Sequence, residues 1–196
     1  MLANISGRKA PNPQEDEIVS VFYSFQDEHI PEYSITACKT GIIIVESEHF
    51  DARMATHAGD VHMVPSELDL INTIIDEVLE LDPDIVVGWE VQAASWGYLE
   101  ARGRTFGVFV ATLYLVAIVN LFFEGLDVSD AIGRAPTRQL GGGSDQWGMR
   151  KTSTFKVTGR HVLNVWRIMR VELSLNIYSF ENVAFQLLNR RCVLAN

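Results

Sequence analysis

The chain has 196 residues, of which 47% are hydrophobic and 21% charged, and its formal net charge at pH 7 is −9. These values indicate one globular domain with a sizeable core, and so acidic a chain is a poor stand-alone binder of nucleic acid. Cys38 and Cys192 lie far apart without a cysteine or histidine partner at metal-ligand spacing, which argues against a structural zinc site and a disulfide-built secreted fold. Residues 1–17 contain no apolar core flanked by basic residues, so we expect an intracellular protein.

The charge is spread unevenly along the chain. Residues 1–100 hold 4 Lys and Arg against 19 Asp and Glu, whereas residues 151–196 hold 7 against 2. The acidic half is typical of a solvated surface. The basic C-terminal part has two interpretations: it faces a phosphate backbone, or it is the outer face of a helix.

The first elements in the chain are two predicted strands. Residues 18–26 (IVSVFYSFQ) alternate and are rich in β-branched and aromatic side chains. Residues 41–47 (GIIIVES) contain a short, fully apolar run, which also indicates a strand. Residues 48–64 are polar and predict an irregular segment.

The clearest helix is predicted over residues 66–81 (SELDLINTIIDEVLEL). Ser66 is a suitable N-cap, with Asp69 three residues further on. Pro83 ends the helix, because proline disfavours helical backbone at the residue before it. The apolar residues at helical spacing are Leu68, Ile71, Ile75, Val78 and Leu79.

A second strand and helix pair follows. Residues 84–90 (DIVVGWE) predict a buried strand, and residues 91–104 (VQAASWGYLEARGR) predict a helix weakened by Gly97. The succession of strand, helix, strand and helix predicts an α/β sheet with at least one parallel pair.

The C-terminal part contains a glycine-rich loop and three further elements. Residues 140–148 (LGGGSDQWG) predict a flexible loop, and residues 153–159 (STFKVTG) predict a strand. Residues 160–173 pass from a strand into a helix. A final amphipathic helix is predicted over 178–191 with Ser179 as its cap. Its apolar face contains Val183, Leu187 and Leu188.

Residues 108–123 (VFVATLYLVAIVNLFF) form an apolar run without any charge. The run is a little shorter than the ~20 apolar residues that span a bilayer, and its flanks are weak anchors. A buried core helix and a transmembrane helix are therefore both interpretations of this segment, and the first fits its length better.

Two residues after the strand at 84–90 are candidates for chemistry. Glu90 lies at the carboxyl end of that strand, where functional residues of α/β sheets gather, and it is a candidate metal ligand or base. The alternatives are a solvated loop carboxylate or a carboxylate that interacts with the start of the next helix, where anions are favoured. Ser95 is neutral and a poor ligand for a hard cation, so a packing or surface role fits it better.

No other chemical motif is complete. The histidines show no metal-binding spacing; His57 and His62 fall in a stretch predicted to be a loop. No nucleophile elbow, Walker loop or dinucleotide fingerprint is present. By its residues alone, the chain offers no complete active site.

Two blocks of the sequence resemble a known family. Residues 82–102 (DPDIVVGWEVQAASWGYLEAR) resemble the second exonuclease motif of family B DNA polymerases, which runs approximately PDI-x-x-GYNI-x-x-FD-x-PYL-x-x-R. Residues 155–191 resemble the next block, a strand that opens with Gly-Arg and a helix. The strings WGYL, LNVWRIMR and YSFENVAFQLL are most similar to a translesion member of the family.

The resemblance implies a ribonuclease H-like fold, an α/β mixed sheet flanked by helices. Residues 1–196 would form one exonuclease-like domain fragment, interrupted by the apolar run at 108–123 and the glycine-rich loop near 140–148. Because the family joins the stretches on either side of this run through a modest polar connection, a translated intron is a third interpretation of the run, beside a buried insertion.

The departures from the motif remove its chemistry. Where proofreading members carry Asn and then a metal-binding Asp, this chain has Glu90 and Ser95, and Tyr98 completes the degenerate motif. The first exonuclease motif would precede Met1 and the third would follow Asn196. We therefore expect no catalytic residue and no metal site in this fragment. For the parent protein, the resemblance implies Mg²⁺ in the polymerase domain and an iron–sulfur cluster in its C-terminal region.

The resemblance predicts a non-catalytic exonuclease-like domain of a nuclear translesion DNA polymerase, which serves DNA repair and replication. Its expected partners are DNA, bound weakly through the parent, and the accessory subunits of the parent, with no membrane. The alternatives are an active metal-dependent 3′–5′ exonuclease and a protein anchored to a membrane by 108–123. The candidate DNA-contacting residues are Arg160, Arg167, Arg170, Arg190 and Arg191.

Overall fold

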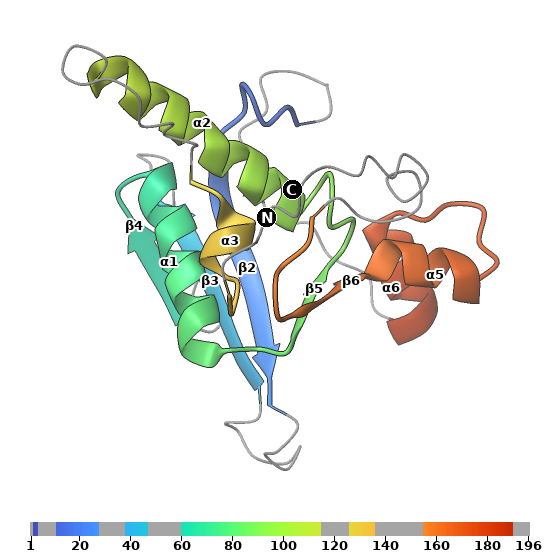
Figure 1. Cartoon of the computed structure of the whole chain (residues 1–196). Coiled ribbons are helices and arrows are strands. Elements are labelled where there is room, and N and C mark those ends of the chain that lie inside the picture. The colour runs from blue at the N-terminus through green and yellow to red at the C-terminus, as the bar shows by residue number, and fades with distance from the viewer. Residues whose placement is uncertain are drawn as a thin grey trace, which may run out of the picture.

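The computed structural model of the chain contains two sheets and several helices (Figure 1). The residues that it describes are 2–3, 11–27, 38–46, 60–114, 126–135 and 155–189.

The larger sheet has four strands in the order β1-β2-β3-β4. Its strands are β1 (Leu2–Ala3), β2 (Ile18–Gln26), β3 (Cys38–Val45) and β4 (Asp60–Val64). The β2 and β3 strands are antiparallel, from Ser20 opposite Ile44 to Gln26 opposite Cys38, whereas β3 and β4 are parallel. The sheet is therefore mixed.

The first strand predictions are confirmed, and one segment was predicted wrongly. The bounds of β2 match the predicted strand, and β3 begins three residues before the predicted one, at Cys38. Residues 60–64, which were expected to be irregular, form β4, so His62 lies in a strand rather than in a loop. The five residues of β4 (DVHMV) end a mainly polar stretch and are too few for a clear strand pattern, and the strand is defined by its parallel pairing with β3. His57 lies outside the described residues.

The helix α1 (Glu67–Leu81) packs on the four-stranded sheet, in front of it in Figure 1. Ser66 caps the helix as predicted: its Oγ accepts from the Asp69 amide at 3.2 Å and donates to the Asp69 carboxylate at 2.6 Å. Of the predicted apolar face, Leu68 is only half-buried and Leu79 is exposed. The apolar residues that α1 buries are Leu70, Ile71, Ile74, Ile75 and Val78.

The smaller sheet pairs β5 (Ile85–Gly88) with β6 (His161–Asn164) in parallel. The two sheets contain two parallel pairs, β3–β4 and β5–β6, so the predicted α/β class with at least one parallel pair is confirmed. The fold is a mixed α/β arrangement. The described strands form two small sheets rather than the single mixed sheet expected from the resemblance.

The helix α2 (Trp96–Tyr114) differs from the predicted helix at both ends. It begins later than expected, because residues 89–94 form turns after β5. It also continues through residues 108–114, the first part of the apolar run, while residues 115–123 lie outside the described residues. No helix among the described residues is both long and apolar enough to cross a membrane.

The elements after α2 are short. The helix α3 (Val128–Ala131) precedes a turn, and residues 140–148 of the predicted glycine-rich loop lie outside the described part. The strand predicted over 153–159 is wrong for its described residues, because 155–157 have no regular secondary structure and 158–159 form a turn. Gly159 turns the chain there with a positive φ of 82°. Phe155 and Val157 are nevertheless buried in the core.

The last two helices are α5 (Val165–Glu172) and α6 (Phe180–Leu188). In Figure 1 they lie beside β6, on the side away from the four-stranded sheet. Ser179 caps α6 as predicted, because its Oγ accepts from the Asn182 amide at 3.3 Å. The predicted apolar face of α6 is only partly buried: Val183 is in the core, whereas Leu187 and Leu188 are exposed.

Candidate functional site

The candidate site begins with a tight turn directly after β5. Glu90 has a positive φ of 44°, and its carbonyl oxygen accepts from the amides of Ala93 at 3.2 Å and Ala94 at 3.0 Å. The Glu90 side chain is half-buried. This turn lies at the carboxyl end of a parallel strand, as the sequence predicted for Glu90.

Ser95 follows this turn, and its hydroxyl packs against the end of β5. Its Oγ is buried and has no hydrogen-bond partner among the described residues. A Cβ atom placed on Gly88, the last residue of β5, would lie 2.5 Å from this Oγ. The hydroxyl therefore occupies the space that the missing Gly88 side chain leaves. The larger side chain of an aspartate would not fit there without a shift of the backbone.

The segment around Ser95 is held by its neighbours. Trp96 donates from its indole nitrogen to the Val87 carbonyl at 3.1 Å and stacks on Phe155, with ring centres 6.2 Å apart. The Gly97 amide donates to the Val91 carbonyl at 2.7 Å. A Cβ atom on Gly97 would lie 2.4 Å from a backbone oxygen of Gln92, so no other residue fits in this turn. The glycine that weakened the helix prediction is therefore required by close packing.

Tyr98, the last residue of the degenerate motif, has a structural contact. Its ring is buried, and its hydroxyl donates to the Asp16 carbonyl oxygen at 2.7 Å. Burial raises the pKa of the Tyr98 hydroxyl, and the negative charges of Asp16 and Glu67 raise it further, while Arg102 acts in the opposite direction. Tyr98 thus fastens the segment before β2 to α2 and lies in the core.

One helical turn further, Arg102 forms a buried ion pair with Glu67 at the start of α1. Their side chains are 7% and 6% exposed. The Arg102 Nε donates to one carboxylate oxygen at 2.8 Å, Nη2 donates to the other, and Nη1 donates to the Pro13 carbonyl at 3.0 Å. Glu67 also accepts from the Ile18 amide at 2.7 Å. The hydrogen bonds from Arg102 to Glu67 raise the pKa of the guanidinium.

This ion pair was missed in the sequence analysis, although a signal for it was present. Arg102 is the arginine that ends the quoted motif, and a position shared with a family pattern indicates either a site or a packing role. Glu67 carried no such signal, because its partner lies 35 residues away in the sequence.

Arg160 does not lie on the surface where a DNA contact was predicted. Its side chain is 1% exposed, and Nε donates to the Ile132 carbonyl at 2.7 Å. Nη1 donates to the Pro83 carbonyl at 2.5 Å and lies 2.7 Å from the Asp82 carboxylate. Burial leaves this guanidinium no exposed surface for a phosphate, so Arg160 instead ties the end of α1 to the start of β6.

A second arginine completes this network. Arg134 lies 2.9 Å from the Asp82 carboxylate and 2.6 Å from that of Asp84. Hydrogen bonds from Arg134 and then from Arg160 hold the pKa of the exposed Asp82 carboxyl below its usual value. Neither Arg134 nor Asp82 was singled out from the sequence, because their pairing depends on the turn at residues 132–135.

The other predicted DNA-contacting residues are divided between surface and undescribed chain. Arg167 and Arg170 are exposed on α5, and the guanidinium of Arg170 lies over the ring of Trp166 at 4.8 Å. Arg190 and Arg191 lie outside the described residues. Glu90 lies in the turn after β5, Ser95 packs against Gly88, and Tyr98 lies on α2 with its hydroxyl bonded to Asp16. Arg167 and Arg170 lie on a separate helix.

A metal site needs several oxygen, nitrogen or sulfur ligands that converge on one point. Within the described ranges, no group of three or more His, Cys, Asp or Glu side chains is arranged to hold a metal ion. At the position of the motif's metal-binding aspartate, Ser95 offers a neutral hydroxyl that is packed against Gly88. A neutral hydroxyl is a poor ligand for the hard cations that two-metal hydrolysis uses.

Comparison with known proteins gives consistent matches along most of the chain. Residues 4–183 match the family model described as DNA polymerase family B, exonuclease domain. Similar relatives are the DNA polymerase zeta catalytic subunits of Saccharomyces cerevisiae (29% identity over 96% of this chain), Mus musculus (31% over 92%) and Homo sapiens (28% over 92%). This chain spans 12% of the yeast protein and 6% of each mammalian one.

Proposed function

The chain belongs to the exonuclease domains of family B DNA polymerases, and on this premise we propose that it is a non-catalytic exonuclease-like domain of a zeta-type polymerase. It would support DNA synthesis past damage as a structural part of that enzyme. The matched region is a small part of the relatives' length, so we assign synthesis itself to the parts of such an enzyme that this chain does not match.

The buried hydroxyl of Ser95 is the observation that carries this proposal. Two-metal hydrolysis of a phosphodiester needs several carboxylates that converge on ions ~3.5–4 Å apart. At the position where the resemblance places a metal-binding aspartate, the chain has a neutral group enclosed against Gly88. The contacts of Tyr98 with Asp16 and of Arg102 with Glu67 give the remaining motif residues a role in holding the domain together.

The ribonuclease H-like arrangement is part of the proposal. The supporting observations are the antiparallel β2–β3 pair, the helix α1 packed on its sheet, and the parallel β5–β6 pair that follows. In this arrangement, β2 and β5 would belong to one continuous sheet in the intact polymerase. A structure of the intact polymerase tests it, because separate sheets there would contradict the arrangement.

The setting of the domain is proposed from its relatives. We propose a nuclear protein that works with DNA and with the accessory subunits of the polymerase, and that has Mg²⁺ or an iron–sulfur cluster in other segments. The description of the relatives as DNA polymerase zeta catalytic subunits is consistent with this setting. Disruption of the gene that encodes the chain is expected to lower mutagenesis induced by ultraviolet light. Unchanged induced mutagenesis would contradict the translesion role.

The test of the non-catalytic proposal is a nuclease assay with the full chain. Single-stranded DNA labelled at its 5′ end is incubated with the protein and Mg²⁺ or Mn²⁺, and its length is followed on a gel. We expect no shortening by the wild type or by Glu90→Gln. Metal-dependent shortening that Glu90→Gln abolishes would establish the active exonuclease instead. Trace nuclease contamination would shorten the DNA equally with both proteins.

The Ser95→Asp variant tests whether one added carboxylate at this position is enough for nuclease activity. Because one carboxylate does not assemble a two-metal site, we expect this variant to remain inactive. Metal-dependent cleavage gained by this single change would contradict the proposal.

A further inference from the structure

The segment from α5 to α6 carries an arginine stacked on two aromatic rings. The guanidinium carbon of Arg170 lies 4.8 Å from the ring centre of Trp166 and 5.7 Å from that of Tyr178. Arg170 is exposed, whereas the two aromatic residues are half-buried. Arg170 remains exposed in these contacts, so part of its side chain is open to solvent.

Hydrogen bonds hold this stack in place. The indole nitrogen of Trp166 donates to the Tyr178 carbonyl at 3.2 Å. The Tyr178 hydroxyl donates to the Leu173 carbonyl and accepts from the Leu175 amide at 3.0 Å. The rings and the loop at 173–178 are therefore fixed before any ligand arrives, which lowers the entropic cost of binding.

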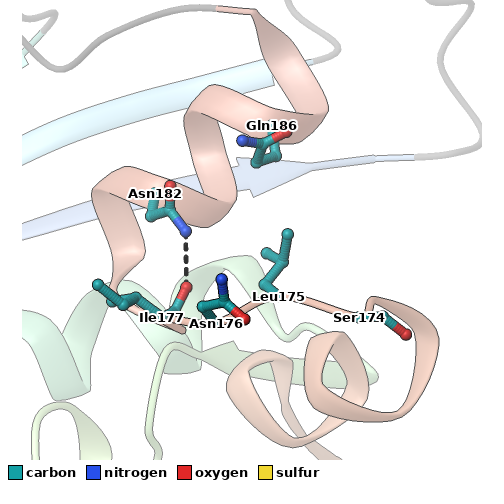
Figure 2. Close-up of a pocket in the computed structure, with 6 residues that line it drawn as sticks. All are labelled: Ser174, Leu175, Asn176, Ile177, Asn182 and Gln186. Carbon is teal, nitrogen blue, oxygen red and sulfur yellow. Dashed lines mark hydrogen bonds between the residues drawn. The ribbon is translucent and has the colours of Figure 1, made fainter.

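The same loop forms one wall of a cavity of about 340 Å³. Figure 2 shows that the loop faces α6 across this cavity. The amide of Asn182 is engaged, because its Nδ2 donates to the Ile177 carbonyl at 2.6 Å. The residues that line the cavity are Ser174, Leu175, Asn176, Ile177, Asn182 and Gln186.

Asn176 and Gln186 supply hydrogen-bonding groups from the two walls of the cavity. Both residues are exposed, and neither side-chain amide bonds to another residue within the described parts of the chain. A carboxamide presents two donors and an acceptor. These groups match the edge of a nucleobase, which offers donors and acceptors in one plane.

The charge of this region also favours a nucleic acid over other planar ligands. The chain as a whole carries −9, but residues 151–196 hold 7 Lys and Arg against 2 Asp and Glu. Arg167 and Arg170 are exposed on α5 beside the loop. An anionic backbone would therefore meet the basic part of an otherwise acidic protein.

We propose that the α5–α6 loop binds single-stranded DNA, with an unpaired base stacked on Arg170 and base edges bonded by Asn176 and Gln186. Unpaired bases bind in this way to arginine planes and aromatic rings in other proteins, largely without regard to sequence. The inference rests on the proposed function, because it gives the non-catalytic domain a contact with the DNA strand.

The test measures affinity for bases separately from affinity for phosphates. Binding of the full chain is followed by fluorescence anisotropy at low salt, with a labelled single-stranded oligodeoxynucleotide and with an abasic oligomer of the same length. We expect the wild type to bind the base-bearing probe more tightly. Arg170→Lys keeps the charge but loses the planar group. It should therefore lower the affinity for the base-bearing probe by about fivefold or more and leave the affinity for the abasic probe unchanged.

The double variant Asn176→Ala/Gln186→Ala should lower affinity for the base-bearing probe in the same way. Matched controls are Arg104→Lys on α2 and Asn72→Ala on α1, because both residues are exposed and lie on other elements. These controls should bind both probes as the wild type does.

Several outcomes would overturn the inference. Equal wild-type affinity for the two probes, an equal loss on both in Arg170→Lys, or no binding at low salt would each remove the base site. Tighter binding of an oligoribonucleotide of the same sequence would overturn the assignment to DNA. If the binding test fails, the proposed function still holds as long as the nuclease assay shows no activity. Metal-dependent shortening of DNA would refute the proposed function even if bases are bound.

Discussion

Replacement of Ser95 by alanine should leave the domain as stable as before or stabilise it. The Ser95 Oγ is buried without a partner among the described residues, although Ser95 directly precedes α2. A buried polar group without a hydrogen bond costs ~1–3 kcal/mol, and alanine removes that group. The lost contact of Oγ with Gly88 offsets part of the gain. We therefore expect a net change between zero and about 1 kcal/mol in favour of the variant.

The same substitution at another helix start provides the control. Ser66 precedes α1 and forms both hydrogen bonds of a cap with Asp69. Loss of such a cap costs ~0.5–2 kcal/mol, so Ser66→Ala should destabilise the protein. The pair of variants removes the same atom at two N-termini, and only the hydrogen bonds differ.

The third variant, Ser95→Asp, should be the least stable. Aspartate is normally favoured at a helix start, because it caps the helix and interacts with its dipole. Here the side chain meets Gly88, and a buried carboxylate without a partner costs on the order of 3 kcal/mol or more. A stable Ser95→Asp variant would show that this space is open to solvent.

The assay is urea unfolding of the three variants and the wild type, followed by circular dichroism at neutral pH. The expected order of stability is Ser95→Ala at or above wild type, then Ser66→Ala, then Ser95→Asp. If Ser95→Ala loses as much stability as Ser66→Ala, then the Ser95 hydroxyl has a partner and the argument from its burial is wrong.

Three further predictions concern the motif residues and the apolar run. Tyr98→Phe should cost about 1 kcal/mol at neutral pH through loss of the bond to Asp16. The folded-state pKa of Tyr98 is raised, so this stabilisation is present below the unfolded pKa of ~10 and disappears as the pH rises through the folded-state pKa. In urea unfolding at alkaline pH, the wild type should therefore lose more stability than Tyr98→Phe. Equal losses in the two proteins would contradict this. Glu67→Gln or Arg102→Met should each cost ~3–5 kcal/mol, because each leaves a buried partner unpaired, and the double variant should cost less than their sum in a double-mutant cycle; additive costs would exclude the coupling. Deletion of residues 108–123, which joins Gly107 to Glu124, should raise soluble yield and sharpen thermal unfolding, because exposed apolar surface promotes aggregation; an unfolded deletion variant would make the run a structural helix that includes the end of α2.

Local patterns were sufficient for the elements that depend on neighbouring residues. The alternation at 18–26, the cap and periodicity at 66–81 and the cap at Ser179 all predicted elements that the structure contains. These signals are local, because a cap and a repeat involve residues three or four positions apart. The α/β class followed from the order of such elements, and the family followed from two motif blocks.

Segments that depend on distant partners were not predicted correctly. The β4 strand has only five residues at the end of a mainly polar stretch, and it is defined by its pairing with β3. Residues 155–159 have the composition of a strand but form none: Phe155 and Val157 pack into the core, and the chain then turns at Gly159. The strength of a strand signal depends on whether another strand lies alongside, and a single sequence does not contain that information.

The candidate site divides in the same way between sequence and structure. The absence of a carboxylate at Ser95 was evident in the sequence, because it is a matter of residue type. That its hydroxyl is enclosed against Gly88, and that Arg160 is buried rather than exposed, required the tertiary structure. The burial of a group depends on every residue that packs around it, and the residues that contact Arg160 include two that are 28 and 77 positions away in the sequence.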